Sequence, residues 1–129
     1  MFMLNKEQVI KVMKESGLPL DQVSFGFGGA LVMHGIREYT HDIDVQCPKE
    51  YFDKLLEQGY EISFVFEGTR VIAYNEYIDL HDEEPQLDRT ECIDGLLCDT
   101  IDEIIRRKTK MGREKDLKDV EAIKKALNK

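Results

Sequence analysis

The stretch that decides the fold is THDIDV, residues 40–45. Side chains alternate between the two faces of a strand, so Asp42 and Asp44 point one way while Ile43 and Val45 point the other. Two neighbouring carboxylates repel each other, and close to a hydrophobic core their burial is costly unless a cation offsets it. The stretch on its own fits a solvent-facing edge strand equally well, so its meaning depends on what surrounds it.

Length and composition limit the class of protein. The chain has 129 residues, and we expect residues 1–129 to form a single domain with a substantial core. The net charge of −8 opposes extensive binding to nucleic-acid phosphates and suits a small or cationic partner better. The sequence has no apolar run of membrane-spanning length and no secretory signal pattern, so we expect a cytoplasmic protein without membrane contact. The three cysteines form no C-x-x-C pair, which argues against a zinc knuckle or a disulfide framework.

Apolar periodicity and turn residues divide the chain into helices and strands. Helices are expected over residues 5–17, 30–35, 48–59, 100–112 and 113–127, with Asn5 and Thr100 as N-caps. Strands are expected over residues 23–27, 42–47, 61–66, 70–74 and 77–81, with 92–98 as one further strand. This order predicts an α/β (α+β) fold with a mixed sheet of about five strands and helices packed against it.

A glycine pair and a third carboxylate give the aspartates of the opening stretch a context. Gly28 and Gly29 follow a strand and precede a helix, where backbone can approach a phosphate closely and unpaired N–H groups favour an anion. On its own such a pair is more often a simple turn. Asp79 stands alone between Ile78 and Leu80 in another expected strand. Mg²⁺ prefers carboxylate oxygens together with substrate phosphates, so convergence of these features predicts a metal–nucleotide site.

Several charged side chains are further candidates. Lys108 continues the inner face of its expected helix, so it either extends to solvent or reaches into a site. Arg37 is either a phosphate or acceptor contact or a surface arginine. Asp116 shares a stripe with apolar residues and is expected to pair with Lys108 or Arg113. His81 lies on the same strand face as Asp79, where it either supports that carboxylate or contacts the acceptor.

These motifs carry a family resemblance. Residues 28–45, GGALVMHGIREYTHDIDV, resemble the signature of the nucleotidyltransferase superfamily that includes DNA polymerase beta, in which a glycine pair precedes a spaced Asp-x-Asp. The His-Gly, arginine and threonine within this segment are similar to those of small lincosamide and aminoglycoside nucleotidyltransferases. YIDLH at 77–81 resembles the family's third-carboxylate strand, and residues 108–123 resemble its closing segment.

The resemblance implies a reaction and a set of residues. The implied nucleotide site consists of Gly28, Gly29, Arg37, Thr40 and Lys108, with Gly29 where serine is frequent in the family. The implied catalytic and metal-binding residues are Asp42, Asp44 and Asp79. The aspartates would hold two Mg²⁺ ions, and Asp79 would also accept a proton from the attacking hydroxyl. The substrates would be a nucleoside triphosphate (NTP) and an unidentified hydroxyl acceptor.

The acceptor stays open at this stage. A small cationic molecule such as an antibiotic fits the charge, and a homodimer would complete a pocket that extra segments complete in antibiotic-modifying members. One alternative is an enzyme of the same fold that modifies protein or RNA, as in a toxin–antitoxin pair. Another is a nucleotide-binding module without catalytic activity.

Overall fold

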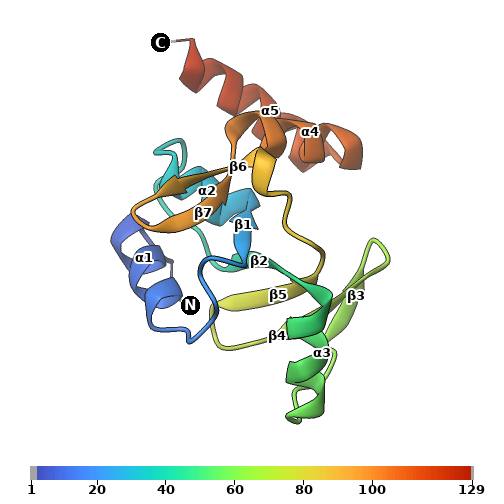
Figure 1. Cartoon of the computed structure of the whole chain (residues 1–129). Helices are drawn as coiled ribbons and strands as arrows, with labels where there is room; N and C mark the ends of the chain where they lie inside the picture. The colour runs from blue at the N-terminus through green and yellow to red at the C-terminus, as the bar shows by residue number, and fades with distance from the viewer. Residues whose placement is uncertain (1–2, 129) are drawn as a thin grey trace.

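A mixed seven-stranded sheet forms the centre of the computed structural model, which describes residues 3–128 (Figure 1). Its strand order is β3-β4-β5-β2-β1-β7-β6. The strands are β1 Ser24–Gly26, β2 Ile43–Cys47, β3 Phe64–Phe66, β4 Thr69–Ala73, β5 Ile78–Asp82, β6 Thr90–Ile93 and β7 Leu96–Asp99. The pairs β2–β5 and β1–β7 are parallel, and the other pairs are antiparallel. The predicted mixed sheet is confirmed, but the prediction of about five strands was too low.

The additional strands come from a tight hairpin. Residues 92–98, expected to be one strand, contain the turn between β6 and β7. Asp94 and Gly95 adopt φ angles of 52° and 83°, as a two-residue type I′ turn requires, and Asp-Gly is a preferred pair for that turn. The chain therefore reverses at Asp94, and β6 begins at Thr90, two residues before the strand expected over residues 92–98.

Within residues 3–128, five helices surround the sheet, and two of them begin at the expected N-caps, Asn5 and Thr100. The helices are α1 Lys6–Lys14, α2 Phe27–Met33, α3 Lys49–Glu57, α4 Ile101–Met111 and α5 Glu114–Leu127, with a 3₁₀ turn η1 Leu87–Arg89. The Asn5 side chain accepts from the Gln8 backbone N–H, and the Gln8 side chain accepts from the Asn5 backbone N–H, each at 2.9 Å. α2 begins at Phe27, earlier than expected, because Phe27 makes the sharp turn itself with a φ of 52°. No helix within residues 3–128 is long and apolar enough to cross a membrane.

The two faces of the sheet have opposite character. Phe25, Val45 and Leu80 are fully buried on one face, within the core cluster that includes buried residues of α1, α2 and α3. The opposite face carries the polar register pairs, in which Asp44 is the partner of both Gly26 and Asp79. One face of the sheet therefore packs into the apolar core, while the other carries polar side chains.

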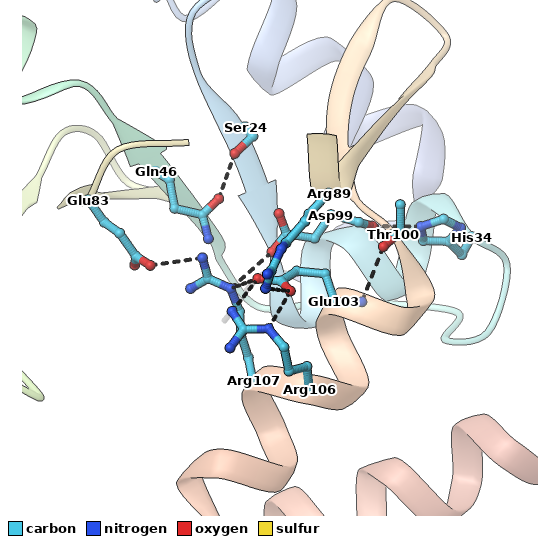
Figure 2. A network of polar contacts seen from close by, with 10 residues as sticks. All are labelled: Ser24, His34, Gln46, Glu83, Arg89, Asp99, Thr100, Glu103, Arg106 and Arg107. Atoms are coloured by element: carbon cyan, nitrogen blue, oxygen red, sulfur yellow. Dashed lines mark hydrogen bonds and ion pairs between the residues drawn. The ribbon is translucent and has the colours of Figure 1, made fainter. Parts of the chain in front are cut away.

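A buried ion-pair network attaches α4 to the polar face near β1, β2 and β7 (Figure 2). Glu103 is only 3% exposed, and its carboxylate accepts hydrogen bonds from Arg106 at 2.7 Å and Arg107 at 3.0 Å. The guanidinium of Arg89 is a third partner, 3.3 Å from a carboxylate oxygen of Glu103. Hydrogen bonds, led by those from Arg106, lower the pKa of Glu103 to about 2. The backbone N–H of Glu103 donates to the Thr100 hydroxyl, so the predicted cap is confirmed.

Arg107 links this network to the sheet. It contacts Glu83 at 2.8 Å and Asp99 at 3.6 Å. Asp99 is 3% exposed, and within residues 3–128 its Oδ2 atom has no hydrogen-bond partner. Burial raises the pKa of Asp99 to about 6. Because Arg107 precedes Lys108 on α4, the contacts that fix Arg107 also fix the direction of the lysine.

We predict that Glu103→Gln destabilises the protein by about 3 kcal/mol at pH 7, which is the size of the pKa shift in free-energy terms. The pKa is about 2 in the folded protein against a reference of 4.5. The contribution is therefore present above the reference pKa and is lost as the pH falls towards the folded value. Urea unfolding at pH 7 and pH 3 measures both effects.

The matched control for this substitution is Glu114→Gln, since Glu114 pairs with Lys118 at an exposed site. This variant should change stability by less than about 0.5 kcal/mol. If Glu103→Gln lowered the free energy of unfolding equally at pH 7 and pH 3, the stabilisation by Glu103 would not come from its charge.

Candidate active site

A cleft of about 800 Å³ opens on the polar face of the sheet. It is lined by side chains or backbone from β2, β3, β5, α2, α4 and α5 and from the α2–β2 segment. Of the residues implied by the family resemblance, those that line it are Gly28, Arg37, Thr40, Asp42, Asp44, Asp79 and Lys108. Gly29 is the exception, because it packs towards Phe25 and Ile43 in the core.

Strand register pairs two of the three aspartates, and all three line the cleft. Asp44 and Asp79 are direct partners across the parallel pair β2–β5, and Asp42 lies just before β2 begins. Asp44 and Asp79 are half-buried, whereas Asp42 stands at the exposed rim. Partial desolvation, followed by repulsion from Asp44, raises the pKa of both Asp42 and Asp79. The cleft therefore concentrates negative charge at an energetic cost.

The chemistry of this donor set fits Mg²⁺. Carboxylate oxygens are its preferred protein ligands, and a divalent cation would offset the mutual repulsion of the three aspartates. Within residues 3–128, however, no three His, Cys, Asp or Glu side chains form a ready-made metal cluster. Mg²⁺ commonly completes its coordination with water and substrate phosphates, so a preformed protein cage is not a requirement.

His81 supports Asp44 rather than Asp79. Its Nε2 atom donates to Asp44 Oδ1 at 3.1 Å, and His81 is 8% exposed. The sequence placed His81 on the correct strand face but could not identify this partner, which lies on the neighbouring strand. The hydrogen bond limits rotation of the Asp44 carboxylate and leaves its second oxygen available.

Gly28 forms the floor of the cleft between Thr40 and Arg37. A Cβ atom at Gly28 would lie 2.7 Å from Thr40 Oγ1 and 2.8 Å from Arg37 Nη1. Both distances are too short for a carbon atom without displacement of a neighbour. Thr40 in turn donates to the Asp42 backbone carbonyl at 2.9 Å. The absence of a side chain at Gly28 therefore lets Thr40 and Arg37 pack directly against its backbone at the cleft.

Two aspartates of α5 pair with the cations that line one wall of the cleft, Arg37, Lys108 and Arg113. Lys108 is 5% exposed, with its Nζ atom 2.9 Å from Asp119 and 3.8 Å from Asp116. Asp119 also contacts Arg37 at 3.5 Å, and Asp116 contacts Arg113 at 2.6 Å. The expected pairing of Asp116 is confirmed for both candidate partners. Asp119 was not among the predicted site residues, although its spacing of three from Asp116 indicates a shared helix face.

Comparison with solved structures supports the fold. The "putative nucleotidyltransferase" TM1012 of Thermotoga maritima matches 97% of this chain and 96% of its own, with a TM-score of 0.60 and 11% sequence identity. Two Helicobacter pylori proteins, JHP933 and a "putative nucleotidyltransferase", each match 80% of this chain, with TM-scores of 0.47 and 0.46 and identities of 16% and 17%. The chain spans 54% and 56% of their lengths.

No protein-family model matches the sequence, and no curated protein matches it. The agreement with the Thermotoga maritima structure extends over nearly the whole of both chains. The chain therefore has a nucleotidyltransferase-like fold, as the sequence motifs predicted.

We predict that Asp44→Asn stabilises the metal-free protein. The raised pKa values of Asp42 and Asp79 mean that these groups cost stability as the pH rises through their folded pKa values. Removal of the central charge relieves that cost by on the order of 1 kcal/mol. Thermal melts in EDTA should show a higher Tm for the variant at pH 8 and no gain at pH 4.

Asp88→Asn is a suitable control, because Asp88 is exposed and lies outside the cleft. Mg²⁺ should then raise the Tm of the wild type more than that of Asp44→Asn. A variant that is less stable than the wild type in EDTA at pH 8 would contradict the proposed repulsion.

Proposed function

We propose that the chain is a Mg²⁺-dependent nucleotidyltransferase that transfers a nucleoside monophosphate group from an NTP to an acceptor hydroxyl. The observation that carries this proposal is the register pairing of Asp44 with Asp79 in a cleft also lined by Gly28 and Lys108. The fold shared with the Thermotoga maritima protein supports the same class of reaction.

The triphosphate would lie at the Gly28 end of the cleft. Gly28 lets the Arg37 guanidinium lie close to its backbone, so this cation stands at the end of the cleft where phosphate oxygens would bind. Arg37 and Lys108 are already held by Asp119, so their positions are set before a nucleotide arrives. Phosphate oxygens would form charge-assisted hydrogen bonds with these cations.

The carboxylates would carry the chemical step. Asp42, Asp44 and Asp79 would hold two Mg²⁺ ions, which stabilise charge on the transferring phosphoryl group when bound. The acceptor oxygen forms a bond to the α-phosphorus while the bond to the α–β bridging oxygen breaks, and pyrophosphate leaves with that electron pair. Asp79 would accept the hydroxyl proton.

A small cationic acceptor such as an antibiotic is the acceptor class that we propose. The chain carries a net charge of −8, and Glu38 adds to the acidic side chains that line the cleft. Such a surface attracts a cation and opposes a long polyanion. An RNA or protein acceptor remains the alternative that an acceptor screen must test.

We predict that Asp79→Asn lowers the rate of nucleotidyl transfer by roughly 100-fold or more, because it removes both a metal ligand and the base. The assay measures pyrophosphate release and label transfer from α-labelled ATP, GTP, CTP and UTP. Acceptors are aminoglycosides, lincosamides, tRNA and protein. Glu76→Gln, an exposed substitution in the turn before β5, should retain the wild-type rate.

Each result of the screen has a defined meaning. Label on aminoglycosides or lincosamides supports the cationic acceptor, and label only on tRNA or protein supports the alternative enzyme. Mg²⁺-dependent NTP binding by the wild type without pyrophosphate release for any acceptor would contradict the enzymatic proposal and favour a binding module.

A further inference from the structure

The cleft has an aromatic end with no role in the phosphate chemistry. Phe64 and Phe66 of β3 line it, and Phe64 is 45% exposed. Strand register places these rings on the same sheet face as the carboxylates, because Phe64 is the partner of Val71, which is the partner of His81. Val65, between the two rings, is 61% exposed and points to the other face.

The two rings differ in how they are held. The Arg113 guanidinium lies 5.4 Å from the centroid of the Phe66 ring, and the ring of His81 meets the Phe66 ring edge-on at 6.4 Å. Phe66 is thereby fixed between the α5 end and β5. Among residues 3–128, Phe64 has no comparable contact with a ring or a cation, and its surface is open to the cleft.

We propose that Phe64 and Phe66 form a nucleobase subsite, in which the base of the NTP stacks on Phe64 beside the fixed ring of Phe66. This inference rests on the proposed function, since it concerns the nucleotide whose phosphates lie near Gly28. The cleft volume of about 800 Å³ lies within the range of pockets that bind small-molecule ligands.

Arg113 favours a base at this end. Its guanidinium is paired with Asp116, and its remaining N–H groups can donate hydrogen bonds to the oxygen or nitrogen acceptors of a neutral base. Stacking needs only a π-face, which every base has. The subsite therefore adds affinity for the nucleoside portion with little preference among the four bases.

The test separates the base from the phosphates. Calorimetry measures the binding of α,β-methylene-ATP and of inorganic tripolyphosphate, each with Mg²⁺, to the wild type and to Phe64→Ala. The expected loss in Phe64→Ala is about tenfold in affinity for the ATP analogue, from lost stacking, with tripolyphosphate affinity unchanged. Phe64→Trp should restore the affinity, and Val65→Ala is the control on the opposite face of the same strand.

Three results would overturn the subsite. Unchanged affinity of Phe64→Ala for the ATP analogue excludes stacking on this ring, and an equal loss for both ligands indicates general damage to the cleft. A change in sedimentation mass without a change in ATP-analogue affinity indicates that a second copy of the chain covers Phe64. A wild type that binds neither ligand overturns the nucleotide site as a whole, which distinguishes failure of the proposed function from failure of the subsite.

Discussion

The parallel pairing of β2 with β5 brings Asp44 opposite Asp79, and apolar packing fixes that register. Val45 and Leu80, the next pair along, are fully buried in the core. A slip of one residue would turn one strand's apolar side chains towards the open face and its carboxylate towards the core. The hydrophobic effect therefore sustains a juxtaposition of charges that repel each other. Burial, followed by repulsion from Asp44, raises the pKa of Asp79.

The opposite wall of the cleft is held by different forces. Buried Glu103 and its arginines attach α4 to the sheet, and Lys108 follows Arg107 on the same helix. Asp119 of α5 then holds Lys108 at 2.9 Å. The cations Arg37 and Lys108 line the same cleft as the three carboxylates but are paired with Asp119 instead. An NTP with Mg²⁺ has the complementary charges, since phosphates suit these cations and metal ions suit the carboxylates.

Local sequence signals identified much of this arrangement. The spaced aspartates, the caps at Asn5 and Thr100, and the inward position of Lys108 follow from periodicity and capping rules. Strand count, Asp119 and the Glu103 network were missed, because a hairpin turn and contacts between distant elements determine them. Phe64 was assigned to a strand, but its run of apolar residues shows no alternation, so the sequence could not tell which face it occupies.

The most direct test of the central claim is a crystal structure of the wild type with Mg²⁺ and a non-hydrolysable NTP. The account predicts metal ions about 2.1 Å from carboxylate oxygens of Asp42, Asp44 and Asp79, with the triphosphate over Gly28. A triphosphate bound elsewhere, or metal ions that leave Asp44 and Asp79 without a shared site, would contradict it.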